Sequence, residues 1–148
     1  MGLEQLIQKD MVEAMKAKDQ GRLDVIRSIK SAILLGKTAE GAGELTDGDI
    51  LKMIQKLIKQ HQDTADQFMA AGRPEQADKE KGEISILEKY LPQQLSEADV
   101  EAKLKEIIAS VGASGIKDMG KVMGTATKML AGQADGKIIS ALVRKLLA

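Results

Sequence analysis

The sequence predicts an all-α protein. Apolar residues recur almost everywhere at spacings of three and four, and strict alternation of apolar and polar residues is scarce. Phe68 and Tyr90 are the only aromatic residues among 148. This argues against a β-sandwich or β-barrel, because β-strands are enriched in aromatic and β-branched side chains. A hydrophobic content of 43% suffices for a buried core and argues against wholesale disorder.

The first part of the chain predicts two helices followed by a loop. Apolar residues return every three or four positions over 3–18, which indicates a first helix. Gly21 interrupts the pattern, and a second helix is expected from there to Leu35. The segment 36–45 has three glycines and no periodicity, so we expect a mobile loop.

Two further helices are expected before residue 92. Thr46 and Asp49 have the spacing of a capping box, which predicts that a long helix opens there and runs over 46–71. Its apolar positions step by roughly 3.5 residues, as the packing of a helical hairpin requires. The next helix, over 74–90, begins with a proline, which the first helical turn tolerates.

The clearest break in the chain is Leu91-Pro92, because a proline pushes the preceding residue out of the α region. Helices are then expected over about 96–110, 116–131 and 137–147, separated by glycines. We therefore predict an N-terminal bundle of about four helices over 1–92 and a small C-terminal three-helix unit over 96–148.

Several classes of protein are disfavoured by composition. The chain has no cysteine, which excludes disulfides, zinc ribbons, iron–sulfur clusters and thiol nucleophiles and suits a reducing cytosol. The start of the sequence lacks the pattern of a signal peptide, and no apolar run approaches the roughly 18 residues of a membrane span. We expect a cytoplasmic protein without a membrane partner.

Two local patterns suggest sites that their context does not support. Gly36-Lys37-Thr38 matches the end of a phosphate-binding loop, but Ser31 stands where the first glycine is needed and a helix is expected to precede it. The only histidine, His61, lies on the apolar stripe of the third helix, where a metal would depend on carboxylates alone.

We interpret His61 as a core or interfacial histidine with one polar partner. Acid–base catalysis by His61 stays open, although no serine or aspartate is spaced to orient it. No catalytic residue, metal ligand or cofactor is predicted.

Charge is distributed unevenly along the chain. The totals of 22 basic and 22 acidic residues cancel, yet residues 112–148 hold six basic and two acidic side chains, a net +4, and the first 111 residues hold −4. A basic end on an acidic body can steer toward phosphate. Because base stacking needs aromatic rings, a nucleic-acid target would be folded RNA recognised through its backbone and shape.

The predicted helix over 116–131 has an apolar side and a lysine side. At 100° per residue, Lys117, Lys121 and Lys128 fall within about 40° of each other, with Gly124 on the same stripe. A bare backbone at Gly124 would let a polyanion approach closely. The apolar side consists of Met119, Val122, Met123, Ala126, Met129 and Leu130.

The last helix repeats this polarity. Lys137 and Arg144 are expected to face outward, and Lys145 flanks that face. A second glycine, Gly120, is expected to permit close helix packing. The alternative is that all these cationic side chains only interact with solvent on an outer face and bind no partner.

Several segments of the sequence form a specific combination. The most specific are Glu83-x-x-x-Leu87-x-x-Tyr90-Leu91-Pro92-Gln93-Gln94-Leu95-Ser96 and Asp118-Met119-Gly120-Lys121-Val122-Met123-Gly124, joined by Ala134-Asp135-Gly136-Lys137 and, near the start, by Ala14-Met15-Lys16 and Leu23-x-x-Ile26-Arg27. Together they make the chain resemble the YqeY family over essentially its whole length. That family is related to the C-terminal tail domain of GatB, a subunit of the tRNA-dependent amidotransferase. The resemblance implies an all-helical protein with a larger N-terminal bundle and a small C-terminal three-helix unit.

The resemblance also implies a partner. The related tail contacts tRNA, and within the matching segments this points to Lys117, Lys121, Gly124 and Lys137. Lys128, Arg144 and Lys145 are added to these candidate RNA-binding residues only because they are positively charged and expected on the outward side of their helices. The implied partners are tRNA and an amidotransferase or a synthetase.

Three functions stay open at this point. The first is a non-catalytic tRNA-binding accessory module. The second is a protein-interaction scaffold in which Gly120, Gly124 and the Tyr90-Leu91-Pro92 hinge serve a partner helix. The third, suggested by the resemblance alone, is a component with carbon–nitrogen ligase activity that uses glutamine as amido-N donor, although the residues do not support independent catalysis.

Overall fold

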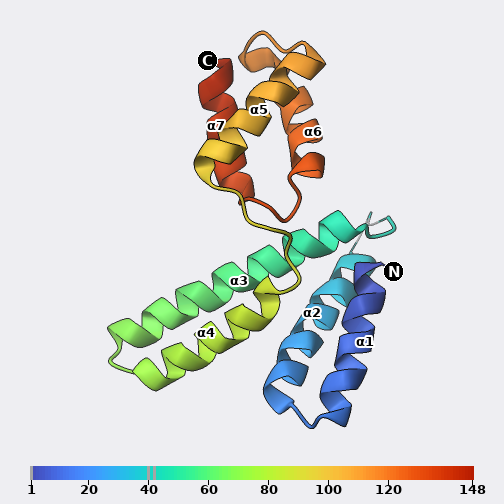
Figure 1. Ribbon diagram of the computed structural model, residues 1–148, viewed down its shortest axis with the longest axis vertical. Coiled ribbons are helices and arrows are strands. Elements are labelled where there is room, and N and C mark those ends of the chain that lie inside the picture. The colour runs from blue at the N-terminus through green and yellow to red at the C-terminus, as the bar shows by residue number, and fades with distance from the viewer. Residues whose placement is uncertain (1, 40, 42) are drawn as a thin grey trace. The chain divides into compact units, whose positions relative to one another are not determined.

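The structure, a computed structural model, describes residues 2–39, 41 and 43–148. Over these residues it has seven α-helices, one short 3-10 turn and no strand, so the all-α prediction is confirmed (Figure 1). The chain divides into two compact units, Met1–Leu91 and Pro92–Ala148. None of the helices in the described part of the chain is long and apolar enough to cross a membrane.

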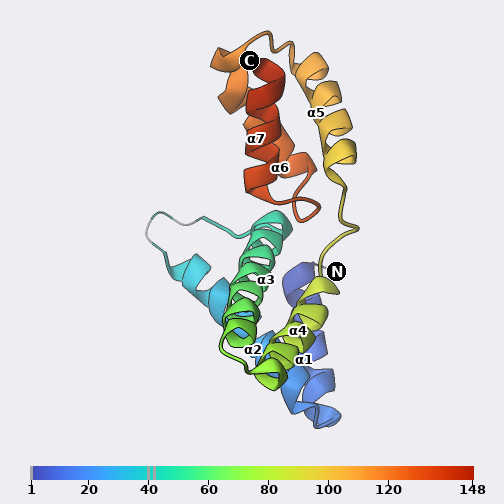
Figure 2. The ribbon, with the colours of Figure 1, turned by 90° about the vertical axis from the view of Figure 1, so that its left-hand side faces the viewer.

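The N-terminal unit consists of two helical hairpins. Figures 1 and 2 show α1 beside α2 and α3 beside α4. Isoleucines dominate the core between the hairpins, and full burial of each stabilises the fold by about 1.5–3 kcal/mol. The helices are α1 (Leu3–Lys16), α2 (Gln20–Thr38), α3 (Asp47–Ala70) and α4 (Pro74–Glu88), and the largest fully buried side chains are Ile7, Ile26, Ile29, Ile50, Ile54 and Leu87.

The N-terminal ends of α3 and α4 follow the sequence signals. The Thr46 hydroxyl accepts a hydrogen bond from the Asp49 N–H at 3.2 Å, and Asp49 Oδ2 accepts one from the Thr46 N–H at 3.0 Å. The predicted capping box is therefore confirmed. Pro74 occupies the first turn of α4, as expected.

The start of the predicted loop 36–45 is wrong, because α2 continues to Thr38. Gly36 is helical and lies against α3: a Cβ added there would come within 2.5 Å of Met53 Cε and 3.3 Å of Leu45 Cδ1. The glycine thus allows close packing inside a helix instead of marking its end. Glu40 and Ala42 lie outside the described residues, and the mobility expected for this loop stays a prediction.

The C-terminal unit has its own core, formed by three helices. Gln94 Nε2 donates a hydrogen bond to the Gly132 carbonyl at 2.6 Å, and the Leu95 N–H donates one to the Gln133 carbonyl at 2.9 Å. These bonds tie the segment after Pro92 to the loop that follows α6. The elements are α5 (Glu97–Val111), η1 (Ile116–Asp118), α6 (Met119–Met129) and α7 (Gly136–Leu147), and the core includes Val100, Leu104, Ile107, Val122, Ala126, Leu130 and Val143.

The single helix predicted over 116–131 is wrong at its beginning. Residues 116–118 form the 3-10 turn η1, and the α-helix starts at Met119. Asp118 holds this turn: its Oδ2 accepts a hydrogen bond from the Ser114 N–H at 2.9 Å, and its N–H donates to the Gly115 carbonyl at 2.9 Å.

Candidate nucleic-acid interface

The outer side of α6 carries two exposed lysines with a glycine between them. Lys121, Gly124 and Lys128 are exposed, while Val122 and Ala126 are buried on the opposite side. Seven residues span two helical turns, so Lys121 and Lys128 are about 10 Å apart along the axis. A Cβ added to Gly124 would meet nothing within 4 Å, so the backbone there is open on this side.

Lys117 is exposed but lies in η1 and not on α6. The α-helical geometry that placed Lys117 on one stripe with the two α6 lysines therefore does not apply to it, because a 3-10 turn does not advance by 100° per residue. The only remaining link between Lys117 and the α6 lysines is that it lies two residues before the start of that helix.

Two other details of this helix differ from expectation. Met129, expected on the apolar side, is 65% exposed, because α6 ends there and the next residue, Leu130, enters the core in its place. The close helix packing expected at Gly120 is absent, since an added Cβ would meet nothing within 4 Å. No described neighbour therefore explains why this position has no side chain.

The outer side of α7 has a similar arrangement. Lys137 and Arg144 are exposed two turns apart, with the small exposed residue Ala141 between them. Lys145 is also exposed, and its Nζ lies 3.9 Å from Glu101 Oε1 on α5. A surface pair of this kind contributes about 0–1 kcal/mol and leaves the lysine free to exchange partners.

Positive charge is concentrated in the last part of the C-terminal unit. Residues 92–148 carry eight basic and six acidic side chains, a net +2, and four of the acidic ones lie on α5. Hydrogen bonds from the Ser114 and Gly115 backbone lower the pKa of Asp118, with smaller contributions from Lys117 and Lys121. The cations of η1, α6 and α7 thus form a basic region beside an acidic helix.

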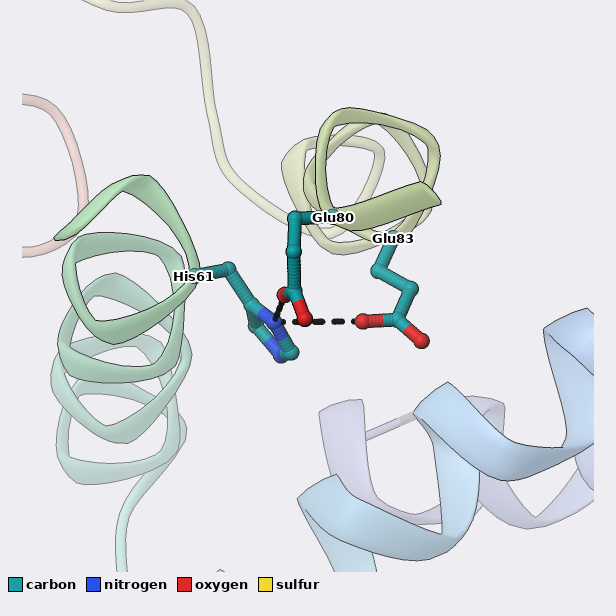
Figure 3. Close-up of side chains that lie close together, drawn as sticks. All are labelled: His61, Glu80 and Glu83. Atoms are coloured by element: carbon teal, nitrogen blue, oxygen red, sulfur yellow. Dashed lines mark hydrogen bonds and ion pairs between the residues drawn. The ribbon is translucent and has the colours of Figure 1, made fainter. Parts of the chain in front are cut away.

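His61 lies in the other unit, half-buried between α3 and α4 (Figure 3). Its Nδ1 contacts Glu80 Oε2 and lies 3.2 Å from Glu83 Oε2. The expectation of one polar partner is therefore wrong, since two carboxylates of α4 face the ring. Sequence reasoning missed them because it does not specify which residues of two helices lie opposite each other.

A groove between α1 and α2 is a second feature that the sequence did not reveal. Its volume is about 810 Å³, and its lining combines apolar side chains with the basic residues Arg27, Lys30 and Lys37. Lys37 Nζ lies 2.5 Å from Glu4 Oε1 across the groove. Leu34, which belongs to this lining, and the adjacent Leu35 are 62% and 71% exposed.

Comparison with known protein families matches residues 4–147 to the family described as Yqey-like protein. Curated relatives carry the name "Altered inheritance of mitochondria protein 41, mitochondrial". The one from Saccharomyces cerevisiae is 33% identical over 105 residues, which is 70% of this chain and 57% of the relative. The one from Lachancea thermotolerans is 30% identical over 110 residues, 73% of this chain and 59% of the relative.

The match to a third relative is longer. The protein of the same name from Pyrenophora tritici-repentis is 26% identical over 145 residues, which is 95% of this chain and 78% of the relative. With the two yeast relatives, by contrast, the chain spans only 57% and 59% of their lengths.

Proposed function

The chain belongs to the YqeY-like family, and on this premise we propose that it is a non-catalytic accessory module that binds folded tRNA through the cations of α6 and α7. One observation carries the proposal: the C-terminal unit segregates its charge, with exposed cations on α6 and α7 and acidic residues on α5. In this role the protein acts beside an amidotransferase or a synthetase that uses the same tRNA.

The form of the interface fits phosphates better than bases. Lys121 and Lys128 on α6, like Lys137 and Arg144 on α7, are paired two turns apart around a small exposed residue that lets a backbone come close. Neither aromatic residue of the chain lies in this unit, so base stacking does not contribute. Contacts of this kind give weak binding that depends on salt, with a Kd of roughly 10⁻⁴–10⁻⁶ M when sequence is not read.

Charge reversal tests the proposal. In anisotropy titrations of labelled total tRNA at low salt, Lys121→Glu/Lys128→Glu and Lys137→Glu/Arg144→Glu should each weaken binding by about tenfold or more. Lys103→Glu/Lys105→Glu on α5 is the matched control, because it changes the net charge equally at two exposed positions. An equal loss in the control, or no binding by the unaltered protein, would overturn the proposal.

We infer docking of a protein helix as a second candidate function, which the groove between α1 and α2 favours. The apolar side chains of the lining, with exposed Leu34 and the adjacent Leu35, suit an apolar helix face, and Arg27 and Lys30 suit acidic residues at its margin. Tyr90 and Leu91 instead pack against the N-terminal core, so they offer little to a partner. Leu34→Glu should abolish protein capture that survives nuclease treatment.

The proposal assigns no catalysis to the chain. Turnover of glutamine by the purified protein with ATP and charged tRNA would contradict it and favour ligase activity. The compartment is part of the proposal as well: cytoplasm or, following the name of the relatives, mitochondria, both of which contain tRNA.

A further inference from the structure

His61 and Glu80 occupy positions where their helices otherwise place apolar side chains. On α3, His61 continues the stripe formed by Ile58 and Ala65, both buried. On α4, Glu80 lies between Ala77 and Ile84, again both buried. Polar side chains at such positions cost stability unless they are paired, so their presence calls for a ligand or a partner.

The three side chains are mostly shielded from solvent. The exposed fraction is 23% for His61, 17% for Glu80 and 22% for Glu83. Glu80 and Glu83 are three residues apart on α4, which brings both carboxylates to the side that faces α3 (Figure 3). The site is thus built from two helices that already pack against each other.

The distances suit a single metal ion. One donor atom from each residue lies within 4.8 Å of the other two, and His61 Nδ1 is 3.2 Å from Glu83 Oε2. Zinc–nitrogen and zinc–oxygen bonds of about 2.1 Å in a tetrahedral arrangement place ligand atoms about 3.4 Å apart. Small side-chain adjustments would therefore bring all three donors to bonding distance of one ion.

The charges of the site also favour a dication. Two carboxylates, those of Glu80 and Glu83, face a single imidazole. A divalent ion would balance both carboxylates at once.

We propose that His61, Glu80 and Glu83 bind one divalent transition-metal ion, preferably Zn²⁺, and that this ion cross-links α3 to α4. An imidazole with two carboxylates suits Zn²⁺ and related ions, whereas Mg²⁺ and Ca²⁺ prefer oxygen ligands alone. Water completes the coordination, because three protein ligands leave a position open. The ion would cross-link the two helices of the hairpin α3–α4 in the N-terminal unit.

A titration of the metal-stripped full chain, prepared without a histidine tag, tests the site. Calorimetry with ZnCl₂ should give one bound ion per chain, and MgCl₂ should give none. His61→Ala and Glu83→Gln should each lower the Zn²⁺ affinity by more than roughly 10–100-fold. That range is typical of mutating a residue that only hydrogen-bonds to a metal ligand. Glu88→Gln, at an exposed position of the same helix, is the matched control and should bind like the unaltered protein.

Two readouts separate a metal site from a simple ion pair. Because His61 is the only histidine, its ring NMR signals need no further assignment, and they should shift on addition of Zn²⁺. The melting temperature should rise with Zn²⁺ in the unaltered protein and in Glu88→Gln but not in Glu83→Gln. Absent binding, or equal Zn²⁺ affinity in all variants, would overturn the proposal; tRNA binding does not enter either measurement.

Discussion

Tyr90 donates its hydroxyl proton to Asp10 Oδ2 at 2.6 Å, which joins the chain just after α4 to α1. Arg22 of α2 lies 3.6 Å from the other carboxylate oxygen, so three segments of the N-terminal unit meet at one side chain. Burial and the contact with Asp10 raise the pKa of Tyr90, which favours the protonated phenol that donates this hydrogen bond. The N-terminal unit is closed by this contact immediately before its end at Leu91.

Removing this hydroxyl should destabilise the N-terminal unit. Tyr90→Phe keeps the ring in the core but leaves the Asp10 carboxylate without its donor. We expect the free energy of unfolding to fall by about 1.5–3 kcal/mol, the scale of a hydrogen bond to a charged group. Urea unfolding followed by circular dichroism measures the loss. Unchanged stability would show that solvent or Arg22 replaces the donor at no cost.

The capping box of α3 predicts a pH dependence. Hydrogen bonds with the Thr46 backbone and side chain lower the pKa of Asp49. A carboxyl with a lowered pKa in the folded state stabilises the fold above its unfolded pKa, and this stabilisation is lost as the pH falls through the folded value.

Asp49→Asn should therefore be less stable than the unaltered protein near neutral pH, and the two should converge as the pH falls below the lowered pKa of Asp49 in the folded state. Urea unfolding across this range measures the difference. Asp63→Asn removes an exposed carboxylate from the same helix outside the cap and serves as the control. A constant difference between Asp49→Asn and the unaltered protein at every pH would contradict the assignment.

Gly124→Ala should change stability and RNA binding in opposite directions. An interior helical glycine costs about 1 kcal/mol relative to alanine, and the added methyl would meet nothing within 4 Å, so the variant should be more stable. If a phosphate backbone approaches Gly124, the same methyl should weaken tRNA binding. Gly82→Ala, at an equally open position on α4, is the matched control for stability.

Thermal unfolding and anisotropy titrations of these two glycine variants give the comparison. Both should melt at a higher temperature than the unaltered protein, and only Gly124→Ala should bind tRNA less tightly. Equal tRNA affinity in the two variants would remove Gly124 from the interface and leave the lysines alone.

The separate cores predict local effects of core mutations. Leu104 is fully buried in the C-terminal core, where replacement by alanine costs about 2–5 kcal/mol. In Leu104→Ala, amide exchange should accelerate in α5, α6 and α7 and stay unchanged in α1 to α4. Hydrogen exchange read by mass spectrometry checks this, and acceleration throughout both units would contradict independent cores.

Much of the fold could be predicted because it depends on local signals. Helical periodicity located all seven helices, and Thr46, Asp49 and Pro74 marked the starts of α3 and α4. The turn η1 could not be predicted, because it depends on the carboxylate of Asp118 reaching back to the Ser114 N–H.

Tertiary contacts explain the remaining differences. Gly36 looked like a helix end but is helical, and its missing side chain leaves room for Met53 of α3. The two partners of His61 depend on how α3 and α4 are aligned, which their separate periodicities do not specify. The exposure of Lys121, Lys128, Lys137 and Arg144 followed from periodicity alone, whereas their role in binding stays a prediction.

The salt dependence of tRNA binding is the sharpest test of the proposed interface. If cations of α6 and α7 replace counterions on phosphates, the logarithm of the binding constant should fall linearly with the logarithm of salt concentration. Lys121→Glu/Lys128→Glu should reduce that slope by about 2, one unit for each phosphate that is no longer neutralised, while Lys103→Glu/Lys105→Glu should leave it unchanged. A slope near zero, or one that the α6 variant does not alter, would contradict binding of tRNA through these helices.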